Sequence, residues 1–231
     1  MCLDKQIYLR KSCRKYSDEI VDLNLIDSAF LSAKSLIGKD VLGYKILTAD
    51  EVNIKTRWRA PYYLALQSEK IDSYKENLGF VFQQVSLYLQ SKGIGSCWVG
   101  MAGPKVRDDN FVITMSFGRS SDMTRALDDF KRKNLNEISD YGDEALIPAQ
   151  LAPSAVNSQP WYFKHCRDGS FDVYQVRQNI FKRKIVEKWN LIDVGIALAH
   201  MYVANSDSFE FFKKSHFDEL KNKNYVGSII I

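Results

Sequence analysis

The sequence predicts an α+β fold built from two similar halves within one compact domain. Short runs rich in β-branched and aromatic residues, such as 44–48 and 110–118, are typical of strands. The stretch 74–92 is apolar around much of a helical circumference and predicts a long, buried helix. A similar set of elements recurs in the second half. With 231 residues, 45% of them hydrophobic, the chain can enclose one sizeable core.

Composition argues against several functional classes. The net charge is only +4 and its signs are interspersed, so we expect no nucleic-acid face, although a local basic pocket for an anion fits. Neither a signal-length apolar run nor an 18-residue apolar stretch occurs, so we expect neither secretion nor a membrane span. The cysteines form no CxxC pair, and we expect four reduced thiols in a cytoplasmic protein without a metal site. They are Cys2, Cys13, Cys97 and Cys166.

Spacing and glycine positions predict the elements of the first half. Apolar residues at intervals of three and four indicate a helix of about ten residues that opens at Asp22 or Asn24. Strands are expected at 44–48 and 60–66, with the charged segment between them looping outward. Gly79 inside the long helix indicates close approach by another backbone or by a ligand, or else tight helix packing.

The segment 151–163 is the most distinctive loop of the chain. It reads Leu-Ala-Pro-Ser-Ala-Val-Asn-Ser-Gln-Pro-Trp-Tyr-Phe, and its two prolines exclude a regular helix or strand interior. A preceding helix must stop near Ala152, and the final aromatic run begins a strand. The loop suits a planar polar ligand beside apolar walls. On composition alone, however, the favoured interpretation is a turn whose Asn and Ser side chains cap their own backbone.

Two basic segments and a glycine-containing stretch complete the candidate site. Residues 10–16 place four cations around a serine, which suits either a phosphate clamp or a solvated turn. Gly93 predicts a left-handed helix cap, and Gly95 and Gly100 leave the following backbone open to a ligand. A second basic cluster at 130–133 is either a ligand site or a surface patch.

The two halves, about 1–125 and 126–231, repeat the same plan with different chemistry. The stretch 77–80 has its counterpart at 193–196, and 111–117 has its counterpart at 225–231. The first half carries the basic and glycine segments, whereas only the second carries the proline loop. His200 on the second long helix is expected to be packed, and His216 in a charged stretch is expected to be solvated.

These segments together resemble the nitroreductase family of flavoproteins, in particular its fused, single-chain branch. Ala-Pro-Ser-Ala-x-Asn-x-Gln-Pro-Trp is similar to the loop by which the family contacts the ring of FMN, and Arg-x-Ser-x-Arg is similar to its phosphate and ribityl clamp. Gly-Ile-Gly-Ser-Cys-Trp-Val-Gly is similar to the stretch whose backbone amide donates to flavin N5. The resemblance implies a nitroreductase-like fold with mostly antiparallel central sheets flanked by helices. It also implies an intramolecular pseudo-dimer with one complete composite site.

The resemblance also implies particular cofactor-binding residues and an activity. It implies a site made of Arg10, Lys11, Ser12, Arg14, Gly100, Met101, Arg132, Pro153, Ser154 and Asn157. It implies an FMN-dependent oxidoreductase that passes hydride from NADH or NADPH to an electron-poor small molecule, nitroaromatic or quinone-like, with no catalytic side chain. A monomer would suffice, because the interface would be internal. The alternatives are a flavin store or sensor without turnover, and a scaffold that binds no flavin.

Overall fold

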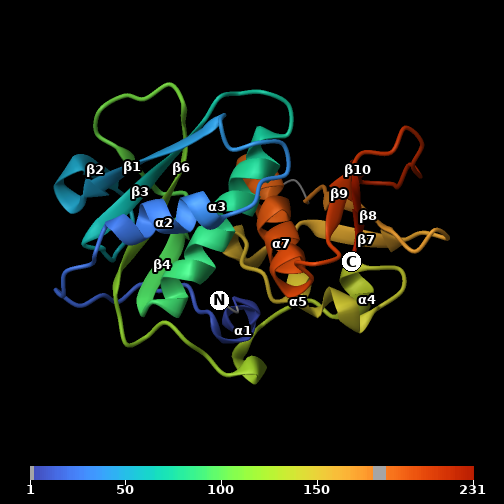
Figure 1. Ribbon diagram of the computed structural model, residues 1–231, viewed down its shortest axis with the longest axis horizontal. Helices are drawn as coiled ribbons and strands as arrows, with labels where there is room; N and C mark the ends of the chain where they lie inside the picture. Colours follow the sequence, from blue (N-terminus) through green and yellow to red (C-terminus); the bar gives the residue numbers. More distant parts are fainter. Residues whose placement is uncertain (1–2, 179–185) are drawn as a thin grey trace.

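Two long helices, α3 (Tyr74–Ser91) and α7 (Asn190–Ala204), lie side by side at the centre of the molecule, with one sheet on each side (Figure 1). This computed structural model describes residues 3–178 and 186–231. Most side chains of both helices are buried, in line with the broad apolar surface that the sequence gives them. The helix pair is therefore the centre of the hydrophobic core.

Each half of the chain contributes one four-stranded antiparallel sheet. The first has the order β1-β3-β6-β4, from β1 (Leu42–Thr48), β3 (Tyr62–Ser68), β6 (Phe111–Arg119) and β4 (Ile94–Val99). The second has the order β7-β8-β10-β9, from β7 (Trp161–His165), β8 (Phe171–Val176), β10 (Lys223–Ile230) and β9 (Glu210–Phe212). Antiparallel sheets flanked by helices agree with the predicted α+β fold.

Short elements connect these layers. The helices are α1 (Asp4–Leu9), α2 (Asn24–Ser32), α4 (Leu135–Ile138) and α5 (Ile147–Gln150). The 3₁₀ turns are Ala49–Glu51, Leu127–Asp129, Glu144–Leu146, Ala155–Asn157 and Glu187–Trp189. A two-stranded sheet pairs β2 (Val52–Ile54) with β5 (Ala102–Pro104). The expected outward loop therefore contains a strand, because its central residues pair with a segment distant in sequence that local spacing does not reveal.

The helix contact depends on two glycines that face each other's helices. A methyl group on Gly79 would overlap the carbonyl oxygen of Ile192, and one on Gly195 would overlap that of Glu76. The two contacts are reciprocal, since each glycine meets the residue three positions before the other. Close backbone approach thus explains Gly79, as the interpretation by tight helix packing predicted. Reciprocity is what an internal duplication requires, although the duplication itself stays a prediction.

His200 is a buried member of this core and carries no charge. It is fully buried, its Nδ1 lies 3.0 Å from the carbonyl oxygen of Pro148, and its Nε2 lies 2.9 Å from the Gln83 side-chain amide. These partners suit the neutral imidazole that donates from Nδ1 and accepts at Nε2. Burial, followed by the field of Arg10, lowers the pKa of His200 to about 3. The packed role predicted for His200 is confirmed, and His216 is exposed as predicted.

Acidification is expected to destabilise the cofactor-free chain through this histidine. The unfolded imidazole takes up a proton near its ordinary pKa of about 6.5, whereas the folded one does so only near 3. Between those values the unfolded state binds more protons, so the free energy of unfolding falls as pH falls, by up to about 1.4 kcal/mol per pH unit. Urea unfolding of the parent chain and of His200→Gln across this range measures the effect. Identical pH profiles for the two proteins would contradict it.

Candidate cofactor site

A cavity of about 300 Å³ opens where the end of β4 faces the proline loop and the start of α7. Both halves of the chain therefore contribute to its walls. Six of the predicted site residues line it, namely Ser12, Arg14, Gly100, Met101, Pro153 and Ser154. The other lining residues are Thr56, Trp58, Cys97, Trp98, Val99, Ile113, Ala155, Val156, Trp189, Ile192, Asp193 and Ile196. Apolar and aromatic walls with a few polar groups suit a flat ligand.

An arginine cluster adjoins the cavity at the end formed by Ser12 and Arg14. Arg10 is 2% exposed, and its Nη2 donates to the Ser12 hydroxyl at 3.1 Å. Arg125 is held beside it, because its backbone N–H donates to the Leu9 carbonyl and the neighbouring Thr124 bridges to Arg10. Within the described part of the chain, none of these arginines, nor Arg132, forms a salt bridge.

Arg10, Arg125 and Arg132 form the arginine cluster. Each has one guanidinium nitrogen that is buried without a hydrogen-bond partner among the described residues. They are Nη1 of Arg10, Nε of Arg125 and Nε of Arg132. Burial is the largest cause that lowers the pKa of Arg10, to about 9, and the fields of Arg125 and Arg132 lower it further. Burial and then Arg125 lower the pKa of Arg132 to about 10. Because unpaired buried charge is costly, this cluster is suited to receive an anion that offers several acceptor oxygens.

Lys11 does not take part in this cluster in the structure. Its ammonium group forms a salt bridge with Asp122 instead, on the polar segment after β6. Lys11 alternates with Arg10 and Ser12 in an extended stretch, so neighbouring side chains point to opposite sides. The structure thus brings Arg10, Ser12 and Arg14 together and directs Lys11 to a different partner.

The proline loop is strained and heavily hydrogen-bonded. Val156, Asn157 and Gln159 all have positive φ, at 45°, 56° and 47°, a region that non-glycine residues rarely occupy. The Ser154 hydroxyl accepts from the Gln159 backbone N–H at 2.9 Å, and the Asp193 carboxylate accepts from the Ala155 N–H at 3.1 and 3.2 Å. These bonds hold Pro153 and Ser154 at the cavity in a conformation that sequence preference alone disfavours.

The side chain of Asn157 points to the second basic cluster and does not line the cavity. Its carboxamide oxygen accepts from Arg132 at 2.7 Å, and its amide donates to the Lys131 carbonyl at 2.7 Å. Arg132 also donates to the Leu151 carbonyl at 3.1 Å. The capping interpretation of the loop therefore holds for Ser154, which accepts from the Gln159 N–H, and not for Asn157. Asn157 instead joins residues 131–132 to the loop and so positions Arg132.

The glycines after α3 have different neighbours. Gly93 has φ +74° and is the left-handed cap that the sequence predicts. A Cβ on Gly95 would lie 2.7 Å from that of Cys13, so Gly95 serves packing and does not face a ligand, contrary to expectation. A Cβ on Gly100 would overlap the indole of Trp189, which covers this part of the cavity wall.

Arg125, Asp193 and Trp189 belong to the site but were not predicted. Arg125 sits in a polar linker that gives no local signal, and its position depends on the bridge to the N-terminal segment. Asp193 is 4% exposed, and burial raises its pKa well above the usual range. Asn77, which the predicted repeat aligns with Asp193, accepts from the Leu36 N–H in the same manner. That comparison could have indicated the role of Asp193.

The described residues include no group of three or more His, Cys, Asp or Glu side chains that could hold a metal ion. Within the same ranges, no helix has both the length and the apolarity to cross a membrane. The three cysteines that fall inside those ranges are unpaired, while Cys2 lies outside them.

Two antiparallel sheets about a central helix pair, with a basic cavity between the halves, define a nitroreductase-like protein. A family model described as "Putative TM nitroreductase" matches residues 3–205, and the chain belongs to this family. A crystal structure described as a putative nitroreductase from Thermotoga maritima is 20% identical, with a TM-score of 0.66, and the match covers 99% of this chain and 92% of that one.

Solved structures of other nitroreductases match only part of the chain. A nitroreductase family protein from Clostridium difficile is 16% identical over 59% of this chain and 95% of its own, with a TM-score of 0.47. An FMN-dependent nitroreductase from the same species is 22% identical over 54% and 91%, with a TM-score of 0.43. No curated protein matches the chain.

Proposed function

We propose that the chain is an FMN-dependent oxidoreductase of the nitroreductase type. Bound FMN would accept hydride from NADH or NADPH and pass it to an electron-poor small molecule, nitroaromatic or quinone-like. The observation that carries the proposal is the trio of buried, unpartnered guanidinium nitrogens on Arg10, Arg125 and Arg132, next to a flat-walled cavity. A phosphate monoester on a planar ring system satisfies both features at once.

The arginine cluster beside the cavity fits a phosphate group. Arg10, Arg125 and Arg132 offer charged donors in a water-poor setting, where bonds to phosphate oxygens are strong. Arg14 is exposed and lines the cavity itself. It would stabilise the negative charge that develops at the pyrimidine edge of a reduced flavin.

The residues of the opposite half would form the other wall. Pro153 and Ser154 line the cavity together with Gly100 and Met101 of the first half, and Ile192 and Ile196 of α7 also line it. The backbone at Gly100 and Met101 is the segment expected to face the ring nitrogen N5. Because one chain supplies both walls, we infer one FMN per chain and a monomer sufficient for binding.

The first test is the visible spectrum and cofactor stoichiometry of the purified chain, with Arg14→Ala as the probe. We expect a yellow protein with about one FMN per chain, and a loss of FMN affinity of at least about tenfold in the variant, because one charged phosphate or ring contact is removed. Arg107→Ala is the matched control, since Arg107 is exposed and paired only with Asp109. A colourless parent chain that takes up no added FMN would reject the proposal.

Anaerobic stopped-flow mixing separates the enzyme from a flavin store or sensor. NADH and NADPH are each mixed with the FMN-loaded chain, and the flavin band is followed. Rapid bleaching, restored by a nitroaromatic or quinone, supports the oxidoreductase. A chain that binds FMN at the expected stoichiometry but is not bleached by either nucleotide would be a flavin-binding protein without turnover.

A further inference from the structure

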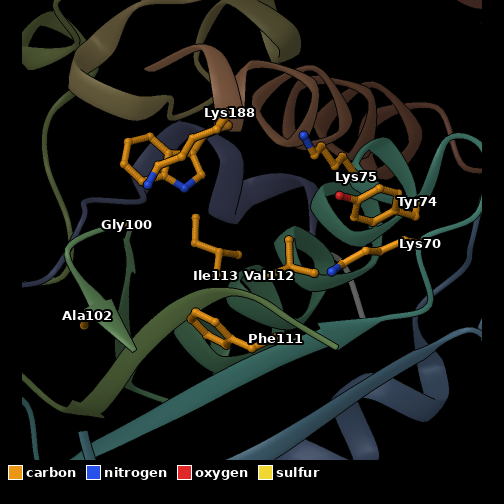
Figure 2. A pocket seen from close by; sticks show the side chains of 10 residues that line it. Lys70, Tyr74, Lys75, Gly100, Ala102, Phe111, Val112, Ile113 and Lys188 are labelled. Atoms are coloured by element: carbon orange, nitrogen blue, oxygen red, sulfur yellow. The ribbon is translucent and has the colours of Figure 1, made fainter. Parts of the chain in front are cut away.

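The molecule has a second, smaller cavity of about 200 Å³, whose lining side chains are shown in Figure 2. It is bounded by the start of β6, the start of α3 and the turn that precedes α7. Gly100, Ile113 and Trp189 line both cavities. The two spaces are therefore adjacent.

Three lysines line this second cavity, and none of the other described residues that line it is acidic. They are Lys70, Lys75 and Lys188, and Figure 2 shows the ammonium groups of Lys70 and Lys75 directed to the same side of it. Within the described ranges, none of the three forms a salt bridge. Of the nearby acids, Asp72 is paired with Lys213 at 3.0 Å, and Glu76 is 7% exposed with a pKa raised by burial. Among the described residues, no salt bridge neutralises the positive charge at this cavity.

Trp189 connects this charge to the proposed ring site. Its indole packs on the backbone of Gly100, and the Lys188 ammonium lies 4.2 Å from the centroid of a Trp189 ring. Gly100 belongs to the segment expected to face the reactive edge of the flavin. An anionic group held by the lysines would therefore lie next to the expected position of the flavin edge.

We propose that the second cavity binds a phosphate or carboxylate group of the ligand whose planar part lies in the cofactor cavity. The inference rests on the proposed function and names its ligand class. That class is a planar molecule with an anionic substituent, either the nicotinamide nucleotide, through its phosphates, or an acidic oxidant. Three ammonium groups that form no salt bridge among the described residues suit the diffuse charge of such a group, and they require no fixed bidentate geometry.

The test compares a triple variant, Lys70→Gln with Lys75→Gln and Lys188→Gln, with a control of equal charge loss, Lys5→Gln with Lys105→Gln and Lys221→Gln. All six lysines lie outside the FMN contacts, so both variants should bind FMN as the parent does. Oxidised, FMN-loaded proteins are titrated with NADP⁺, NAD⁺, 4-nitrobenzoate and its uncharged analogue 4-nitrobenzamide. Binding is read from the flavin difference spectrum, which requires no turnover.

We expect the triple variant to lose at least about tenfold in affinity for an anionic ligand, with 4-nitrobenzamide unchanged within about twofold and the control variant unaffected. A loss confined to NADP⁺ and NAD⁺ identifies the nucleotide as the ligand, and a loss confined to 4-nitrobenzoate identifies an acidic oxidant. If the triple variant still binds FMN and binds all four compounds with the affinities of the parent chain, this inference is wrong, while the proposed function is unaffected. Absence of FMN from the parent chain would reject the proposed function instead.

Discussion

Replacement of Arg10 by methionine is expected to abolish FMN binding and, at the same time, to stabilise the cofactor-free chain. Arg10 is 2% exposed, its Nη1 has no partner, and the nearest strong fields come from other arginines. Exchange of buried, poorly compensated charge for an apolar side chain of similar length raises the free energy of unfolding by about 1–3 kcal/mol. The same change removes a principal donor to the proposed phosphate.

The measurement pairs FMN titration with urea unfolding of cofactor-free protein. Arg10→Lys is the matched control, because it keeps the charge but loses the forked donors, so we expect weakened FMN binding without the gain in stability. The opposite result for methionine, an unstable protein that still binds FMN with parental affinity, would show that the protein itself satisfies Arg10. That result would remove the observation on which the proposed phosphate site rests.

A methyl group at Gly79 is expected to destabilise the fold by at least about 3 kcal/mol, because it would collide with the Ile192 backbone and force the central helices apart. In an exposed helix the same substitution would instead stabilise by about 1 kcal/mol, since alanine favours helix. Gly79→Ala therefore has opposite signs in the two situations. Chemical unfolding of Gly79→Ala measures which one applies.

Gly43→Ala is the control for a small added side chain. Its Cβ would meet only the flexible Gln67 side chain, at 3.2 Å, so a change within about 1 kcal/mol is expected. Gly195→Ala should match Gly79→Ala, since it meets the Glu76 backbone in the reciprocal position. A Gly79→Ala protein as stable as the parent would show that the two helices pack less closely than described.

Elements with strong periodicity or distinctive breakers were predictable. The long helix expected at 74–92 spans Tyr74–Ser91, and the strand expected at 110–118 spans Phe111–Arg119. Asn24 opens the first-half helix, one of the two starts that spacing allowed. These elements can be predicted from short-range patterns, because an element that is buried on one face or on all sides has apolar residues at regular spacings in the sequence.

The site was predictable only where a motif marks it. Arg10 and Pro153 lie in recognisable segments, whereas Arg125 and Trp189 depend on contacts between parts of the chain that are distant in sequence. The side-chain direction of Asn157 was likewise not readable, since a polar loop residue can face a ligand or its own loop with similar energy. Partner choice in such loops is decided by tertiary structure.

The reciprocal glycine contact joins two helices whose surrounding side chains are different. Gln83 on one meets His200 on the other through a single amide–imidazole pair, while Asn77 holds one loop with an amide group and Asp193 holds the other with a carboxyl group. Two copies of one polypeptide related by a twofold axis would have to present identical side chains in both places. In this single chain a substitution changes one position only. One wall of the cavity can therefore gain an acidic or basic group while the corresponding position in the other half keeps its residue.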